Sequence, residues 1–344
     1  VAAGAPNFAV QNCDFLLSIG CRLDNILTAY NPHNFAPHAV KVVVDVDSHE
    51  LARHEMPIEL QVQADARAFL EAWLARQPGG PRHWAAWQAR CADWKRRYLP
   101  LDNRAFATVG EIGHYPFVEA LSEAIPEDRL VVTGSSGLAV EVFYTTFRNK
   151  PGQRLFLTSG LGAMGYGLPA VIGACLGVGR RPTVGIESDG SLMLNVQELA
   201  TLKALGLPIT LIVMNNGGYA SIRNTQRNYF EGRYLGTGPE AGQFIPDWMR
   251  LCEALDLSAL RIERVEDLGA GLAHAMAQRG PYVCEVKLTP VETLAPKVAA
   301  IPQSDGSMLS MPLEDMSPLL SLAQLQAEML SPLDLASIKA RANG

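Results

Sequence analysis

The sequence lacks several features that mark specialised classes of protein. No apolar run approaches the ~18 residues that a membrane-spanning helix needs, so we expect no membrane segment. None of the six cysteines forms a C-x-x-C pair, the usual signal of a zinc or dithiol site. The net charge is −6, so a nucleic acid is not the expected partner. No internal repeat is visible either.

What remains is the composition of an ordinary globular protein, with 48% hydrophobic and 19% charged residues. A length of 344 residues is enough for about two domains. Cysteines within apolar runs, such as Cys175, predict buried free thiols and a reducing, cytoplasmic location. The first residues lack the basic start of a signal peptide and lead at once into a strand-like segment. We therefore expect the chain to begin inside a domain.

Alternating strand and helix patterns predict an α/β fold with a mainly parallel sheet flanked by helices. Apolar, β-branched runs that end in glycine or acids mark the strands, and apolar residues at helical spacing mark the helices. We expect four segments in the chain: part of a first α/β domain over residues 1–78, a helical connection over 79–110, the main domain over 111–295, and a tail over 296–344.

The helical connection carries a stripe of large side chains, formed by Trp84, Trp87, Cys91 and Trp94. Such a stripe could stack against a base or a ring. At helical spacing, however, it is more typical of a face packed against the protein's own core. We therefore predict a packed face.

Polar residues follow two predicted strands of the main domain at the point where each strand ends. Asp189 follows the first strand, and Asn216 follows the next one 27 residues later, which is the length of one crossover with its helix. Ligands of parallel sheets bind beyond the carboxyl ends of the strands. If the two strands are neighbours, both loops emerge side by side at such a position.

These residue types suit a divalent cation. Asp189 offers a carboxylate oxygen and Asn216 an amide oxygen, and Mg²⁺ prefers oxygen ligands that it can share with phosphates. Gly217 and Gly218 let the backbone turn so that a carbonyl faces the ion. Each motif alone could be a simple turn. Together they predict a site for Mg²⁺ and a diphosphate.

The spacing of Asp-Gly-Ser, a helix and Asn-Asn resembles the signature of the thiamine-diphosphate enzymes. The surrounding segments TSGLGAMGYGLPAVIGA (158–174) and SDGSLMLNVQELATL (188–202) are similar to acetolactate synthase large subunits. The similarity extends over nearly the whole chain, with residues 1–75 resembling the later part of the middle domain. It implies a thiamine-diphosphate-binding fold over residues 111–290, preceded by part of a second α/β domain.

The resemblance also implies roles for individual residues. Asp189, Asn216 and the carbonyl of Gly218 would hold Mg²⁺. Met164 would bend the cofactor, and the carbonyl of Gly162 would accept a hydrogen bond from its aminopyrimidine ring. Contacts to the cofactor would come from two further groups of residues, Gly190 with Ser191 and Gly134 with Ser135 and Ser136.

The implied activity is decarboxylation of a small 2-keto acid such as pyruvate, with transfer of the resulting carbanion to an acceptor by a dimer or tetramer. In the family a glutamate from an N-terminal pyrimidine-binding domain activates the cofactor. Nothing in this sequence resembles that domain, so we expect the chain alone to be incomplete. Members that bind FAD carry a second acid and a second arginine where this chain has Asn25 and Ile26. FAD is therefore not predicted.

Two other functions fit parts of the sequence. Gly160, Gly162 and Gly165 match the G-x-G-x-x-G dinucleotide fingerprint, with Glu187 and Asp189 at the distance of its acidic residue. This pattern would indicate a nicotinamide- or flavin-dependent oxidoreductase, but it leaves the Asn-Asn pair unexplained. The chain could also be a non-catalytic remnant that holds the cofactor without turnover.

Three arginines, Arg223, Arg227 and Arg233, follow the Asn-Asn pair in a region that lines the substrate pocket of the family. An arginine here could grip a substrate carboxylate with two hydrogen bonds. A solvated helix and loop is the plainer interpretation of each. The family's synthases carry a tryptophan where this chain has Thr225, so the acceptor substrate is not predicted.

Overall fold

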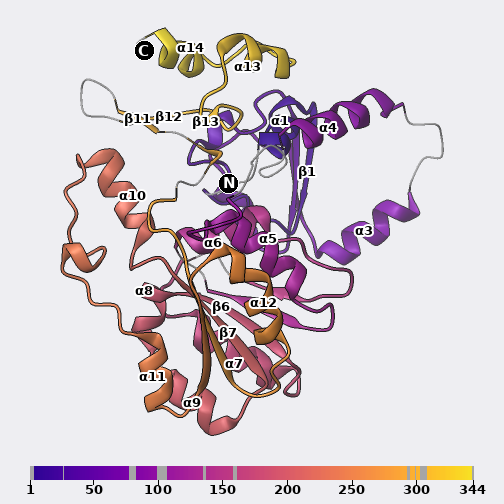
Figure 1. Ribbon diagram of the computed structural model, residues 1–344. Coiled ribbons are helices and arrows are strands. Elements are labelled where there is room, and N and C mark those ends of the chain that lie inside the picture. The colour runs from indigo at the N-terminus through magenta and orange to yellow at the C-terminus, as the bar shows by residue number, and fades with distance from the viewer. Residues whose placement is uncertain are drawn as a thin grey trace. The chain divides into compact units, whose positions relative to one another are not determined.

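The computed structural model describes residues 4–25, 27–76, 83–98, 107–134, 137–157, 161–292, 295–298, 300–302 and 308–342 (Figure 1). The chain divides into two compact units. The larger unit spans Arg104–Leu294, and the smaller unit combines Val1–Asn103 with Ala295–Gly344. The bounds of the four segments expected from the sequence remain a prediction. The structure adds that the C-terminal residues belong to the same unit as the N-terminal ones.

The larger unit is built on a six-stranded sheet in which every pair of neighbouring strands is parallel. The strand order is β5-β4-β6-β7-β9-β8. This sheet confirms the predicted α/β fold. The sequence did not mark β8 as a strand, since its residues are short on β-branched side chains and most are only partly buried. The strands are β4 (Leu130–Thr133), β5 (Leu155–Phe156), β6 (Thr183–Ser188), β7 (Ile209–Asn215), β8 (Ser258–Ile262) and β9 (Tyr282–Lys287).

Helices cover the sheet on both faces. On one face α5 packs against α6 and α12, and on the other α7 packs against β4, β6, β7 and α9. The second face encloses an apolar core that includes side chains of α7, α9 and α11. The helices are α5 (His114–Ala124), α6 (Leu138–Thr146), α7 (Gly167–Gly177), α8 (Asp189–Leu192), α9 (Glu198–Leu205), α10 (Ala220–Tyr229), α11 (Trp248–Ala254) and α12 (Val265–Met276), with short 3-10 turns η2 (Met193–Asn195) and η3 (Pro239–Ala241).

The strand order places a switch point between β4 and β6. From β4 the chain passes to β5 on one side, and then returns to form β6 on the other side of β4. Ligands of open α/β sheets bind where the order reverses in this way, beyond the carboxyl ends of the strands. Numbered along the unit, the order is 2-1-3-4-6-5, whereas dinucleotide-binding sheets commonly follow 3-2-1-4-5-6. The sheet therefore argues against the dinucleotide-binding alternative.

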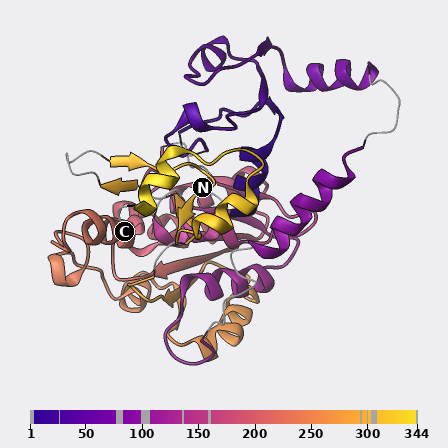
Figure 2. The same cartoon turned by 90° about the horizontal axis from the view of Figure 1, so that it is seen from above.

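The smaller unit has a three-stranded parallel sheet with the order β1-β2-β3. Leu313 of the C-terminal segment packs into the core beside this sheet, and Leu325 and Met329 pack with Phe8 and Trp94. Figure 2 shows the β11–β12 hairpin of this segment as two antiparallel arrows. The N-terminal elements are α1 (Gly4–Asn12), β1 (Phe15–Ile19), η1 (Pro32–Asn34), β2 (Val40–Asp45), α2 (Ser48–Ala52), β3 (Leu60–Gln63), α3 (Ala66–Ala75) and α4 (Ala85–Arg97). The C-terminal elements are β10 (Lys297–Val298), β11 (Ala300–Pro302), β12 (Met308–Ser310), β13 (Met316–Ser317), α13 (Leu322–Glu328) and α14 (Leu335–Ala342).

The tryptophan stripe on α4 is a packed face, as predicted, except at its first residue. Trp94 is fully buried, and Trp87 and Cys91 pack against the same cluster. Trp84 lies at the helix N-cap and is 56% exposed.

No helix within the described ranges is long and apolar enough to span a membrane.

The cysteines are free thiols. Cys175, Cys252 and Cys284 are buried, as predicted. The prediction is wrong for Cys21, which is exposed because it follows β1 in a surface loop.

Candidate functional site

The two strand ends predicted to form a site do lie together. β6 and β7 are neighbours, with Ser188 paired to Met214, so Asp189 and Asn216 follow the carboxyl ends of adjacent strands. One carboxylate oxygen of Asp189 accepts the backbone N–H of Gly218 at 2.8 Å, and the other accepts that of Gly190 at 2.8 Å. The two loops are thus tied directly to each other through the Asp189 carboxylate.

The Asp189 carboxylate is completely buried. Burial raises its pKa to about 6, against the opposing effect of the Gly218 and Gly190 N–H groups and the nearby charge of Arg223. A buried carboxylate favours a compensating positive charge. The position therefore suits a bound cation.

Asn216 is also buried, and its side-chain oxygen has no hydrogen-bond partner within the described ranges. Buried amide oxygens are nearly always paired, so an unpaired one calls for an explanation such as an ion. The amide nitrogen of Asn216 lies 3.5 Å from the Nε2 atom of His114. This arrangement leaves the oxygen as the end of the side chain that is open to a ligand.

Two glycines allow the loops to approach this closely. A Cβ atom on Gly190 would lie 2.6 Å from the Tyr219 ring. A Cβ atom on Gly218, whose φ is +116°, would meet the carbonyl of Thr237 at 2.6 Å. A side chain on Gly190 would push apart the segments after β6 and β7, and one on Gly218 would displace the segment around Thr237, so the glycines serve packing as well as turning.

The loop that carries Met164 and Gly162 is fastened to the loop after β6. The backbone N–H of Gly165 donates to the Ser191 hydroxyl at 2.9 Å, and the Asn195 amide donates to the Gly165 carbonyl at 2.8 Å. Met164 is 43% exposed. Its side chain is thus not core packing but stands at the surface next to the site. Gly162 is exposed and has a φ of +60°.

Gly134 follows β4 at the switch point, and its N–H donates to the carbonyl of Ile186 at 2.7 Å. The buried carboxylate of Glu187 lies where Cβ atoms on Gly134 and Gly167 would be. Glu187 therefore fills the space between the loop after β4 and the start of α7, and burial raises its pKa to about 7. Ser135, Ser136 and Gly160 lie outside the described residues.

Two residues next to the predicted site, His114 and Glu187, could not be assigned to it from the sequence. His114, fully buried beside Asn216, gives no signal in the sequence because the two are 102 residues apart. Glu187 appeared only as the acidic residue of a dinucleotide fingerprint, whereas it packs against glycines of two site loops. Only the paired loops of the folded sheet show either role.

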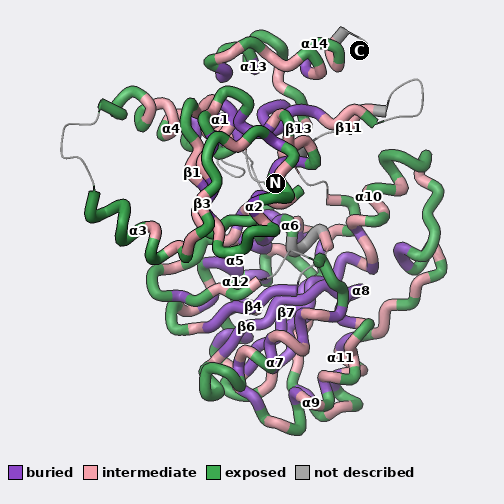
Figure 3. Tube along the Cα trace, turned by 180° about the vertical axis from the view of Figure 1, so that it is seen from behind, coloured by how far each residue is buried: buried purple, intermediate pink, exposed green. Residues whose placement is uncertain are grey.

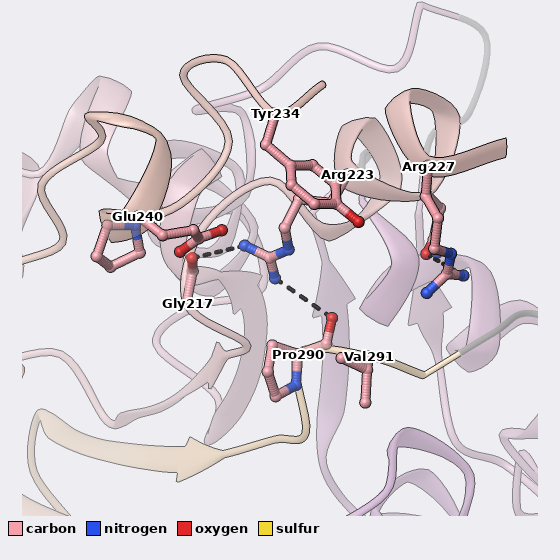
Figure 4. A pocket seen from close by; sticks show the side chains of 9 residues that line it. Gly217, Arg223, Arg227, Tyr234, Glu240, Pro290 and Val291 are labelled. Atoms are coloured by element: carbon pink, nitrogen blue, oxygen red, sulfur yellow. Dashed lines mark hydrogen bonds between the residues drawn. The ribbon is translucent and has the colours of Figure 1, made fainter. Parts of the chain in front are cut away.

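The arginines after the Asn-Asn pair differ in position. Arg223 and Arg227 line a cleft of about 310 Å³ beside the Gly217 loop, together with Tyr234 and Glu240 (Figure 4). Arg233 is exposed and pairs with Glu231 at 2.9 Å. A solvated loop is the correct interpretation for Arg233.

The oxygens at this site fit a magnesium ion with a diphosphate. Asp189 supplies a buried carboxylate and Asn216 an unpaired amide oxygen. No group of three His, Cys, Asp or Glu side chains that could hold a metal occurs in the described part of the chain. A cation bound here would thus draw on amide, carbonyl and phosphate oxygens in addition to one carboxylate, a set that Mg²⁺ accepts.

Two family descriptions match the chain. Residues 133–286 match the thiamine pyrophosphate enzyme C-terminal TPP binding domain. Residues 1–73 match the central domain of the thiamine pyrophosphate enzymes.

Similar proteins include the acetolactate synthase isozyme 2 large subunit of Escherichia coli (strain K12), which is 30% identical over 86% of this chain and 51% of the relative. Acetolactate synthase 1, chloroplastic, of Nicotiana tabacum is 30% identical over 85% of this chain and 44% of the relative. The chain therefore spans about half the length of the curated relatives it matches.

A thiamine diphosphate-dependent 4-hydroxybenzoylformate decarboxylase from Rhodococcus jostii RHA1 has a similar fold. The TM-score is 0.58 at 21% identity, over 73% of this chain and 44% of the decarboxylase. From the two domain matches, the chain belongs to the thiamine pyrophosphate enzyme family, of which it contains the central and C-terminal domains.

Proposed function

We propose that the protein is a thiamine-diphosphate- and Mg²⁺-dependent enzyme of the acetolactate synthase type. It would decarboxylate a small 2-keto acid such as pyruvate and transfer the resulting two-carbon unit to an acceptor. The similarity to acetolactate synthase large subunits supports this class of substrate. The free thiols are in keeping with a cytoplasmic enzyme.

The observation that carries the proposal is the pair formed by Asp189 and Asn216. A buried carboxylate and a buried amide oxygen, which has no partner among the described residues, lie at the ends of adjacent strands, and the Gly218 N–H ties the second loop to the carboxylate. We assign Mg²⁺ to Asp189, Asn216 and the carbonyl of Gly218. Bound there, the ion would neutralise the diphosphate and hold it at the switch point of the sheet.

The remaining residues would orient the cofactor. Gly190 and Ser191 lie buried in α8, directly after β6, and would contact the diphosphate, as would the segment from Gly134 through Ser135 and Ser136. Met164 and Gly162 belong to the loop tied to Ser191 and would shape and hold the rest of the cofactor. When bound, the cofactor supplies the electron sink for decarboxylation.

We further propose that these 344 residues do not catalyse the reaction efficiently by themselves. The chain spans about half the length of its relatives, and the two domains that it matches are the central and the C-terminal TPP binding domain. The glutamate that assists proton transfer would come from residues outside this sequence, in a dimer or tetramer. General acid–base assistance of this kind contributes roughly 10²–10⁴-fold in rate.

The test is to measure pyruvate decarboxylation by the purified 344-residue chain with thiamine diphosphate and Mg²⁺, then with an added N-terminal domain from an acetolactate synthase. We expect cofactor binding in both cases and a rate increase of about 10²-fold or more on addition. Full activity of the chain alone would contradict the proposed incompleteness. Binding without turnover in every combination would identify a non-catalytic cofactor-binding protein instead.

A further inference from the structure

Arg223 lies on α10 with its guanidinium against the loop that carries the predicted metal ligand. One terminal nitrogen donates to the carbonyl of Gly217 at 2.7 Å and to that of Thr237 at 2.8 Å. The other donates to the carbonyl of Asn216 at 2.6 Å and to that of Pro290 at 3.5 Å. The close-up in Figure 4 shows the guanidinium between Gly217 and Pro290.

These four contacts occupy the terminal N–H groups of the guanidinium. An arginine has five N–H donors, of which four lie on the two terminal nitrogens. A carboxylate is normally gripped by two such donors in parallel. Arg223 has them directed at backbone carbonyls, so it is not available to bind a substrate carboxylate in this way.

The carbonyls that Arg223 binds come from three separate segments. Asn216 and Gly217 belong to the loop after β7, Thr237 precedes η3, and Pro290 follows β9. The Thr237 carbonyl also accepts the N–H of Tyr219 at 2.9 Å. The guanidinium therefore fixes the backbone of the loop from several sides at once.

The loop has little intrinsic rigidity. Gly217 and Gly218 have φ angles of +74° and +116°, which only glycine adopts readily, and such residues are the most flexible in an unfolded chain. Charge-assisted hydrogen bonds to the carbonyls of Asn216 and Gly217 restrict this freedom. They also direct these two carbonyls toward the guanidinium.

We propose that Arg223 is a positioning residue that holds the Asn216-Gly217-Gly218 loop in the conformation required for metal binding. It acts through the backbone and touches neither the ion nor the substrate. This inference rests on the proposed Mg²⁺ site. Outer partners that orient metal ligands typically contribute about 10–100-fold to metal affinity.

The test measures Mn²⁺ as a probe of the metal site, by electron paramagnetic resonance in the presence of thiamine diphosphate. Arg223→Met removes all four hydrogen bonds while retaining an unbranched side chain, and we expect Mn²⁺ affinity to fall about 10–100-fold. Arg223→Lys keeps the charge but has fewer donors in reach. Its Mn²⁺ affinity should therefore lie between those of the wild type and Arg223→Met. The matched control is Arg181→Met, because Arg181 also donates to a backbone carbonyl, that of Asp128 at 2.8 Å, but lies at the amino end of β6.

The outcomes separate this inference from the proposed function. If the wild-type chain binds no Mn²⁺ with the cofactor, the proposed metal site itself is wrong. If the wild type binds and Arg223→Met binds equally well, the positioning role is wrong. Should Arg223→Met fail to fold by circular dichroism, the Lys variant decides, and wild-type affinity in that variant would overturn the inference.

Discussion

The two units of the chain are stabilised in different ways. In the larger unit every residue of β6 and β7 is buried, and Figure 3 draws these strands in the colour of buried residues. Their carboxyl ends carry polar side chains such as Ser188 and Asn215. In the smaller unit β3 has no buried residue and α3 buries none of its side chains. There, a buried acid, Glu328, accepts hydrogen bonds from Trp94 at 2.8 Å and Tyr98 at 2.9 Å, and it pairs with Arg97.

The difference teaches that buried carboxylates serve different purposes in the two units. In the larger unit the buried carboxylate of Asp189 accepts backbone N–H groups at the carboxyl end of the sheet. In the smaller unit the buried carboxylate of Glu328 is paired with Arg97, and this contact joins the N-terminal and C-terminal segments. Substitutions in the two units should therefore affect different properties, cofactor binding in one and stability in the other.

The largest effect is expected from Asp189→Ala in the larger unit. Removing one charged partner from a buried contact costs roughly 2–5 kcal/mol, so the affinity for thiamine diphosphate with Mg²⁺ should fall about 30-fold or more. The fold should stay largely intact, with a lower melting temperature, because the backbone N–H groups of Gly218 and Gly190 lose their acceptor. Titration calorimetry measures the affinity. Asp256→Ala, which removes an exposed carboxylate paired with Lys203, serves as the control, and equal affinities in the two variants would refute the assignment.

A smaller effect on stability is expected from Glu328→Gln in the smaller unit. Its pKa is lowered to about 2, from an ordinary 4.5, mainly by the hydrogen bond from Arg97. A carboxylate with a lowered folded-state pKa stabilises the protein above its unfolded-state pKa. We expect a loss of about 1–2 kcal/mol at pH 7, between the values of exposed and buried ion pairs.

The pH dependence sharpens this prediction. The stability that Glu328 provides should be complete above pH 4.5 and should disappear as the pH falls toward about 2, so the wild-type and Gln proteins converge in acid. Urea unfolding curves at pH 7, 4 and 2.5 measure the difference. Glu71→Gln, an exposed acid 3.9 Å from Arg67, should show almost none. A constant gap between wild type and Glu328→Gln at every pH would contradict the charge-based explanation.

The smallest effect on cofactor affinity is expected from Met164→Ala, since the diphosphate and the ion provide most of the binding. The affinity should change less than about threefold, which is under 1 kcal/mol. With the N-terminal domain supplied, exchange of the thiazolium C2 proton should slow about 10²-fold, the scale on which a misplaced reacting group lowers a rate. Proton NMR follows this exchange. Val178→Ala, at the far end of α7, provides the comparison, and unaltered exchange in Met164→Ala would exclude the shaping role.

Much of the architecture could be predicted from local sequence patterns. Strands such as β6 and β7 are continuous apolar runs that end in polar residues, so their type and bounds follow from composition. Residues 195–206 have helical spacing, and within them the structure begins α9 at Glu198, after the end of η2 at Asn195. β8 was missed because its stability comes from pairing with β9 rather than from its own residues.

The sequence by itself determined the fold class, the family and the two loops that carry Asp189 and Asn216, because strand periodicity and turn residues are local properties of the chain. Only the tertiary structure decided that β6 and β7 are neighbours and that His114 meets Asn216. It also decided that the terminal nitrogens of Arg223 donate their hydrogen bonds to backbone carbonyls. These contacts join residues far apart in sequence or depend on side-chain direction, and no local pattern encodes the burial and hydrogen bonding that select them.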